Sequence, residues 1–322
     1  MRAAVYYETG GPEVFRYEEV ADPTCGPGEV LIDVEAVSIE GGDTLNRLGG
    51  DLAAVPHVVG YQCAGTVAEV GDGIDDLAPG DRVVTVGMDG SHAERRVAAR
   101  PFCWPIPDGL ATVEAACVPV AFGTSHDALF EFGRLQAGET VLVQAAAGGV
   151  GLAAVQLASR AGARVLATAS GSDRLARLAE YGVDLGIDYT TTELTPAVLE
   201  ATEGRGVDVV VDGVGGPTLQ ASIRSLAYRG RCISFGDAGR SEPDRLDVST
   251  MRANNQTLCG YFLGAELFLG NRAHTVVAAC LDDVAAGDLR VVVDRTFPLS
   301  EAGEAHAYIE SRQAFGRVVL VP

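Results

Sequence analysis

The chain of 322 residues contains no lysine, so every basic side chain other than histidine is arginine. Without a lysine amine the protein has no means to form a Schiff base, to carry a phosphate-loop lysine, or to use the Tyr-x-x-x-Lys pair of some dehydrogenases. The sequence also lacks a G-x-S-x-G turn, which serine hydrolases of that type require. These absences exclude four common kinds of enzyme site.

Positive charge is scarce overall, because 44 acidic residues face 24 arginines and give a formal net charge of −20. A protein that binds nucleic acid or an anionic membrane needs a basic face to neutralise phosphates. The N-terminal stretch has no apolar signal-peptide core, and no segment reaches the roughly 20 apolar residues of a membrane helix. We therefore expect a small-molecule partner, with no nucleic acid and no membrane.

Cysteine motifs are missing as well. The chain has an odd number of cysteines at wide spacings, with no C-x-x-C, which is typical of buried thiols in a reducing, cytoplasmic compartment. The seven are Cys25, Cys63, Cys103, Cys117, Cys232, Cys259 and Cys280.

The pattern of apolar residues changes along the chain. The first 120 residues read as strands and turns such as "EVLIDVEAVSI" and "GTVAEV", punctuated by glycine and proline. From about residue 122, strand patterns alternate with helix patterns through "TLCGYFL", which predicts parallel βαβ units and a six-stranded dinucleotide-binding sheet. The tail from residue 264 returns to helix and strand, so the length and the pattern both indicate two domains.

A glycine cluster opens the βαβ series in "VLVQAAAGGVGLAAVQLA", residues 141–158. Missing side chains at Gly148, Gly149 and Gly151 allow backbone N–H groups to approach a pyrophosphate, which the helix dipole also favours. Ala146 replaces the first glycine of the G-x-G-x-x-G pattern, and glycine also serves close helix–strand packing. The position of the motif favours dinucleotide binding.

The end of the second strand distinguishes the two nicotinamide cofactors. An NAD site places an acid there, whereas "ATASGSDR" offers Ser170, Gly171 and Ser172 followed by Arg174, which suits the 2′-phosphate of NADPH over NADH. An alternative is that Ser172 caps the next helix while Asp173 and Arg174 face solvent, and Asp173 could then reach a ribose.

Together, "GEVLIDVEAVSI", "AGTVAEVGDGIDDLAPGDRV", "GETVLVQAAAGGVGLAAVQLASRAGARVLATA", "GVDVVVDGVGGPTLQASIRSL", "GRCISFG" and "FGRVVLVP" resemble the zinc-independent, zeta-crystallin-like quinone oxidoreductases of the medium-chain dehydrogenase/reductase superfamily. The resemblance covers nearly the whole chain. It implies an α/β fold with a GroES-like β-rich catalytic domain (residues 1–122 and 264–322) around a Rossmann NADPH-binding domain (residues 123–263). It also implies a homodimer formed through the edge strand "TLCGYFL".

The resemblance also implies the cofactor contacts. The turn should hold the pyrophosphate, Arg174 the 2′-phosphate, Tyr189 the adenosine end, and Thr124 the nicotinamide half, while two loops line the nicotinamide and Arg317 replaces the usual lysine of the closing strand. The implied set is Thr124, Ala147, Gly148, Gly149, Val150, Gly151, Ser170, Arg174, Tyr189, Gly213, Val214, Ser234, Phe235, Gly236 and Arg317.

The positions that hold zinc ligands in zinc-dependent relatives carry Glu40, Tyr61, Gln62 and Val120, and the four-cysteine lobe is missing. We expect no metal, because this set lacks the soft Cys and His ligands of such sites. His57 and His92 are expected to be core or surface residues rather than metal ligands, and the net negative charge argues against the electropositive setting that a reactive Cys63 thiol would need.

Without a metal, the implied reaction is two-electron reduction of quinones or α,β-unsaturated carbonyls by hydride from NADPH. Tyr61, Glu40 and Gln62 are the candidate catalytic residues, with Tyr61 as hydrogen-bond or proton donor. Tyr61 could instead only pack, and Glu40 could face solvent or hold a ribose hydroxyl. We expect His126 to pack in its helix.

Two other functions stay open. One is reduction of enoyl thioesters, as in polyketide synthases, although those domains often carry a lysine near the proton-delivery site. The other is a crystallin-like protein that binds NADPH without chemistry. The natural substrate depends on segments that we expect to be loops, "RLGGDLAAVPHVV" and "LGAELFLGNRAH".

Overall fold

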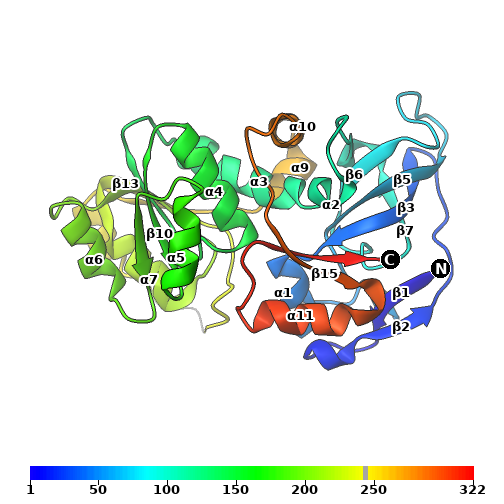
Figure 1. Cartoon of the computed structure of the whole chain (residues 1–322), viewed down its shortest axis with the longest axis horizontal. Helices are drawn as coiled ribbons and strands as arrows, with labels where there is room; N and C mark the ends of the chain where they lie inside the picture. Colours follow the sequence, from blue (N-terminus) through cyan, green and yellow to red (C-terminus); the bar gives the residue numbers. More distant parts are fainter. Residues whose placement is uncertain (242–245) are drawn as a thin grey trace. The chain divides into compact units, whose positions relative to one another are not determined.

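The computed structural model describes residues 1–241 and 246–322, which form two compact units (Figure 1). One unit combines Met1–Val120 with Gly264–Pro322, so the two ends of the chain fold together. The other unit is the middle of the chain, Ala121–Leu263. In the described ranges no helix combines the length and the apolar character that crossing a membrane requires.

Six parallel strands form the sheet of the second unit, in the order β11-β10-β9-β12-β13-β14. The chain runs outward from β9 in one direction and from β12 in the other, so the winding reverses between these two strands. Ligands of such sheets bind at the carboxyl ends of the strands at this point. The strands are β9 (Thr140–Val143), β10 (Arg164–Ala169), β11 (Leu185–Asp188), β12 (Val207–Asp212), β13 (Leu226–Ser234) and β14 (Thr257–Gly260).

Helices pack against this sheet, and Figure 1 shows α4 and α5 beside its strands. The apolar residues Leu142, Leu166 and Val210 of the strands meet Val198 of α6 and Ile223 of α7 in one core cluster. Burial on both faces explains why these strands read as continuous Val, Leu and Ala runs. The helices are α3 (Val118–His126), with a π-helical segment at Asp127–Glu131, α4 (Gly149–Arg160), α5 (Ser172–Ala179), α6 (Leu194–Ala201), α7 (Gly216–Arg224) and α8 (Val248–Ala253).

The first unit is built on two sheets. The smaller has the order β2-β1-β4, and the larger has the order β15-β16-β3-β5-β6-β8 with β7 also paired to β3. The C-terminal strand β16 joins β3 directly, with Val319 opposite Ser38. The strands are β1 (Arg2–Tyr6), β2 (Arg16–Glu19), β3 (Glu29–Ser38), β4 (His57–Val58), β5 (Gln62–Val70), β6 (Arg82–Val86), β7 (Arg95–Ala99), β8 (Cys103–Pro105), β15 (Val293–Pro298) and β16 (Arg317–Val321).

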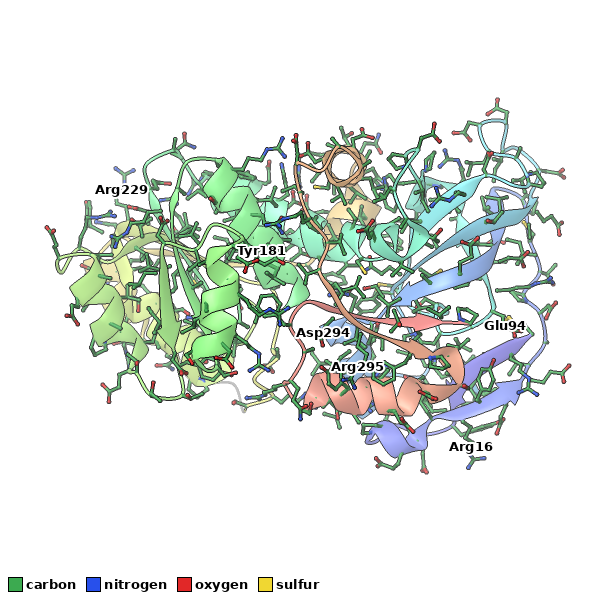
Figure 2. The ribbon with its side chains drawn as sticks, viewed as in Figure 1. Arg16, Glu94, Tyr181, Arg229, Asp294 and Arg295 are labelled. Atoms are coloured by element: carbon green, nitrogen blue, oxygen red, sulfur yellow. The ribbon has the colours of Figure 1, made fainter. Side chains whose placement is uncertain are left out.

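Helix α11 (Ala302–Glu310) fixes the C-terminal segment of this unit. The hydroxyl of Tyr308 on α11 donates to Asp294 of β15 at 2.7 Å, and the Arg295 guanidinium lies 4.4 Å from the centre of the Tyr308 ring. Figure 2 labels Asp294 and Arg295 beside this helix. The unit also contains α1 (Gly41–Gly49), α2 (Thr112–Ala115) and α10 (Arg272–Ala285), together with short 3₁₀ turns at Pro12–Val14, Arg100–Phe102 and Leu299–Glu301, and α9 spans Leu263–Leu269.

The predicted α/β fold with a Rossmann sheet and a GroES-like β-rich part is confirmed. Two local expectations are wrong. The segment "LGAELFLGNRAH" is not a loop, since α9 covers Leu263–Leu269 and α10 begins at Arg272. The segment "RLGGDLAAVPHVV" is a loop only in its middle, since it begins inside α1 and includes β4 near its end.

Candidate functional site

The glycine turn lies between β9 and α4, at the carboxyl edge of the sheet. Gly151 is buried in the first turn of α4, where an added Cβ would stand 2.5 Å from the carbonyl oxygen of Ala145 and 2.6 Å from the Cα of Ala146. Only glycine fits there. Ala145 has a φ of +48°, and its carbonyl accepts the N–H of Gly148 at 3.0 Å, which closes the turn.

The N-terminus of α4 is well suited to an anion. The helix has twelve residues and no acidic side chain in its first turn, and Gly148 at its N-cap is exposed. The first N–H groups of an α-helix have no acceptor within the helix, and the dipole adds positive potential there. Gly149 and Val150 are partly exposed, whereas Ala147 is buried. The turn therefore presents backbone donors without side chains in front of them.

A basic group stands beside the end of β10. Arg174 Nη1 donates to Ser170 Oγ at 3.0 Å and to the Ser170 carbonyl oxygen at 3.2 Å. Ser172 does not cap α5, because Gly171 with a φ of +80° occupies the N-cap and no side chain accepts there. The capping alternative is therefore wrong. Tyr189 is 46% exposed and follows β11, and its N–H donates to Ala169 at 3.3 Å, so it lies at the same sheet edge.

Two loops meet at the ends of β12 and β13. An added Cβ on Gly213 would stand 2.6 Å from the Phe235 ring, and one on Gly236 would stand 2.9 Å from the Gly213 carbonyl oxygen. Val214 lies beside Asp212, whose Oδ1 accepts the Val214 N–H at 2.8 Å. Both glycines are therefore needed for these loops to pack together, with Ser234 at the end of β13. Thr124 on α3 is buried, in the same unit.

In the first unit a buried ion pair joins the two ends of the chain. Arg317 Nη2 contacts Glu40 Oε1 and also donates to Ser38 Oγ at 2.6 Å and to the Ile39 carbonyl oxygen at 2.9 Å. Glu40 is only 3% exposed, so the expectation that it faces solvent is wrong. Burial raises the pKa of Glu40, against the attraction of Arg317.

Gln62 completes this cluster. Its Nε2 donates to Glu40 Oε1, and its Oε1 accepts the Val120 N–H at 3.0 Å. Burial alone would lower the pKa of Arg317, but the surrounding acids, Glu40 first, leave it raised. Gln62 and Arg317 thus have partners within the unit and hold Glu40 in place.

Tyr61 lies next to this cluster and is held at both ends. Its hydroxyl oxygen accepts from Asn46 Nδ2 at 3.2 Å, and its N–H donates to Asp43 Oδ1 at 3.1 Å. The ring packs on the bare backbone of Gly42, where a Cβ would overlap it. Burial raises the pKa of Tyr61, and the charge of Asp43 raises it further. The phenol is therefore protonated at neutral pH.

Asp43 and Asn46 were not predicted from the sequence. Asp43 is fully buried, and its Oδ2 accepts the N–H of Glu40 at 2.8 Å. Burial raises the pKa of Asp43 to about 7. An acid three residues after the residue that precedes a helix is a recognisable capping signal, so "EGGD" could have indicated it.

Histidine and cysteine side chains do not form a metal site in the part of the chain that the structure describes, where no group of three or more His, Cys, Asp and Glu is placed to hold an ion. His92 and His306 are both buried, with their Nε2 atoms 3.0 Å apart. His126 packs edge-on against Phe130. Burial raises the pKa of Cys63, which makes this thiol unreactive.

Known proteins share this architecture. Family models match at residues 26–108, described as an alcohol dehydrogenase GroES-like domain, and at residues 181–320, described as a zinc-binding dehydrogenase. The chain is 34% identical to a 2-haloacrylate reductase of Burkholderia sp., across 99% of this chain and 98% of the relative. It is 33% identical to a quinone oxidoreductase of Pseudomonas aeruginosa, across 97% of each.

Solved structures agree with these sequence relatives. A mycobacterial protein complexed with NADPH superposes with a TM-score of 0.94 at 34% identity, over 100% of both chains. The quinone oxidoreductase of Escherichia coli complexed with NADPH superposes with a TM-score of 0.95 at 26% identity, also over 100% of both chains. The chain belongs to the quinone oxidoreductase family of the medium-chain dehydrogenase/reductase superfamily.

Proposed function

We propose that the protein transfers hydride from NADPH to a quinone or an α,β-unsaturated carbonyl compound, without a metal ion. The observation that carries this proposal is the turn at the N-terminus of α4, where Gly151 admits no side chain and the first helical turn has no acidic residue. NADPH supplies the hydride when bound, so the residues of the chain have to bind it and stabilise the product.

The second unit supplies most of the proposed cofactor contacts. Backbone N–H groups of the turn would hold the pyrophosphate, and Arg174 beside Ser170 would hold a 2′-phosphate, which favours NADPH over NADH. Asp173 on the exposed face of α5 is the rival ribose contact. The NADPH in two related structures supports the choice. The remaining proposed contacts in this unit are Thr124, Ala147, Val150, Tyr189, Gly213, Val214, Ser234, Phe235 and Gly236.

The first unit supplies the proposed proton donor. Because Asn46 donates to the Tyr61 oxygen, the Tyr61 proton is left to point elsewhere, toward the oxygen of an electrophile. Glu40 would repel a developing enolate if it were an isolated carboxylate, but Arg317 neutralises it. We propose that Glu40 and Gln62 shape this site, and a direct contact between Arg317 and the cofactor stays a prediction.

The residues of this cluster do not fit a zinc ion. Glu40 already faces a guanidinium cation, and both ends of the Gln62 amide are bonded to protein groups. A second cation beside Arg317 would be repelled, and burial raises the pKa of the neighbouring Cys117 thiol to about 11, so it does not offer the thiolate that zinc prefers. We therefore propose that activity survives prolonged dialysis against EDTA, despite the zinc-binding description of one matching family model.

Reduction of activated alkenes has specific support. The relative from Burkholderia is named for 2-haloacrylate, which is an α,β-unsaturated carboxylate and accepts hydride by conjugate addition. Enoyl thioesters are electrophiles of the same kind and remain the alternative substrate. A protein that binds NADPH without chemistry is the other alternative.

Association and location are further proposals. β14 stands at one end of the strand order, and Phe262, just after it, is 51% exposed. We propose a homodimer formed through this edge, for which light scattering should give twice the mass of the chain.

All seven cysteines are free, which suits the reducing, cytoplasmic compartment that we expect.

The central experiment follows NADPH oxidation at 340 nm with a panel of quinones, enones, 2-haloacrylates and crotonyl thioesters. Saturable NADPH binding with turnover of quinones or enones is expected. Faster turnover of thioesters would move the assignment to the enoyl-thioester alternative. Binding without turnover of any electrophile would favour the non-catalytic alternative, and absence of saturable binding would overturn the proposal.

A further inference from the structure

A continuous chain of buried side-chain hydrogen bonds crosses the middle of the parallel sheet. Thr168 Oγ1 on β10 donates to Gln144 Oε1, just after β9, at 2.7 Å. Gln144 Nε2 donates to Ser222 Oγ on α7 at 2.9 Å, and Ser222 Oγ donates to Asp212 Oδ2, at the end of β12, at 2.7 Å. None of the four residues is more than 4% exposed. We call these four residues the buried bridge.

Each end of the buried bridge holds a backbone turn of the candidate site. Thr168 Oγ1 accepts the N–H of Ala145 at 3.1 Å, in the glycine turn. Asp212 Oδ1 accepts the N–H groups of Val214 at 2.8 Å and Gly215 at 3.0 Å, in the loop after β12. The two turns that would hold the two halves of a dinucleotide are therefore tied to the same set of side chains.

Both turns need an anchor. Ala145 has a φ of +48°, a conformation that costs a non-glycine residue free energy unless its surroundings impose it. Gly215, with a φ of +73°, is the N-cap of α7 and has no side-chain cap of its own. The hydrogen bonds from the Ala145 N–H to Thr168 and from the Gly215 N–H to Asp212 hold these two backbones in their conformations.

The direction of the bonds is fixed from one end to the other. A carboxylate only accepts, so the Ser222 hydroxyl must give its proton to Asp212 and accept from Gln144. The Gln144 amide then turns its oxygen to Thr168, whose own oxygen accepts from Ala145. Every donor points toward Asp212, and such aligned bonds strengthen one another in a buried setting.

We propose that the buried bridge positions the glycine turn and the loop after β12 together, so that Ser222, whose hydroxyl bonds to Gln144 and Asp212, controls the affinity of both for a dinucleotide. This inference rests on the proposed function, because it assumes that these two turns hold NADPH. Thr168, Gln144, Ser222 and Asp212 are positioning residues in this sense.

The test compares Ser222→Ala with Ser225→Ala. Ser225 lies just after the same helix and is equally buried, but its hydroxyl group donates to the Ala221 carbonyl group and to Thr195 rather than to the buried bridge. Dissociation constants are measured for NADPH and for 2′-phospho-ADP-ribose, which carries the diphosphate but no nicotinamide, at a temperature well below both unfolding midpoints.

We expect Ser222→Ala to weaken binding of both probes about five-fold, the value of roughly one hydrogen bond, while Ser225→Ala changes neither by more than about two-fold. In the double variant Thr168→Val/Ser222→Ala, the dissociation constant should rise by less than the product of the two single-variant increases, because both substitutions break the same buried bridge. Equal effects of the two serine variants, wild-type affinity in Ser222→Ala, or fully multiplicative effects would overturn the proposal.

A second variant covers the case in which Ser222→Ala does not fold. Thr168→Val alone keeps the volume of the side chain and should lower kcat at saturating NADPH, because the distant loop after β12 loses its alignment. An unchanged kcat would overturn the proposal that the buried bridge positions the two turns. Failure of the wild-type protein to bind NADPH would instead overturn the proposed function, so the two failures are distinguishable.

Discussion

The guanidinium of Arg317 pairs with the carboxylate of Glu40 inside the first unit, although 277 residues separate them in the chain. Ser38 and the Ile39 carbonyl group accept from the same guanidinium, so the cation has hydrogen-bond partners as well as an opposite charge. The pairing brings a residue of the last strand against the residue that precedes α1. It thereby fixes the helix that carries Asn46 and Asp43 under Tyr61.

Breaking this pair from one side should destabilise the protein strongly. Arg317→Met and Glu40→Gln should each lower the free energy of unfolding by about 3 kcal/mol, because a buried charge is left without its partner. The loss of unfolding free energy in the double variant should be much smaller than the sum of the losses in the two single variants. Urea unfolding measures all three.

The matched control is Arg205→Met, which breaks the more exposed ion pair with Asp208. It should cost less than about 1 kcal/mol. Additive losses in the Arg317 and Glu40 variants would contradict a direct pairing of these two side chains.

The sequence predicts the sheet and the glycine turn well, because both depend on local patterns of strand, glycine and helix. It does not predict the partner of Glu40, since β16 meets β3 only through the topology of the fold. The Gln144–Ser222 contact, 78 residues apart in sequence, is hidden for the same reason. Asp43 is different, because it bonds to Glu40 three residues before it and the capping signal of α1 was visible, whereas Asn46 meets Tyr61 only through the fold.

Stability should depend on pH through Asp43. Its pKa in the folded protein, about 7, lies above the value of about 3.9 expected in the unfolded chain, so the folded state binds the proton more tightly. This contribution to stability is present at low pH and is lost as the pH rises from about 4 to about 7. The difference in unfolding free energy between wild type and Asp43→Asn should therefore shrink over that range.

The measurement is chemical unfolding at intervals of pH, with Asp75→Asn as a control on an exposed loop. The plots of unfolding free energy against pH should run parallel for the wild type and the control. If the Asp43→Asn curve also runs parallel to them, the shift of the Asp43 pKa is wrong.

Gly151→Ala should disrupt the turn at α4. The added methyl group would meet the Ala145 carbonyl oxygen and the Ala146 Cα, which are backbone atoms that have no rotamer to change. We expect NADPH affinity to fall about ten-fold or more, together with a lower unfolding temperature. Fluorescence titration with NADPH provides the measurement.

Gly49→Ala is the helical control, because a Cβ there meets open space. It should raise stability slightly, since alanine favours a helix over glycine. Equal NADPH affinity in the two variants would show that the turn tolerates a shift and that its tight packing is unimportant for the cofactor.

Arg174→Ala should change cofactor preference. Removing a charged donor from a phosphate costs about ten-fold or more in affinity, so the KM for NADPH should rise by that factor while kcat/KM with NADH stays nearly the same. Arg177→Ala, one turn further along the exposed face of α5, should leave both cofactors unaffected. A parallel loss with NADPH and NADH would favour Asp173 and the ribose over a 2′-phosphate site.

Tyr61→Phe should lower kcat about ten-fold or more with little effect on the KM for NADPH, because only the proton or hydrogen bond offered to the electrophile is lost. Asn46→Leu should produce a smaller decrease in kcat, since the phenol remains but loses the Asn46 hydrogen bond that orients its proton. Tyr7→Phe, which removes only a hydroxyl bonded to Glu18 at the surface, is the control and should be unchanged. The measurement is the steady-state rate of each variant with the best substrate of the panel. A wild-type kcat in Tyr61→Phe would mean that the Tyr61 ring only packs on Gly42.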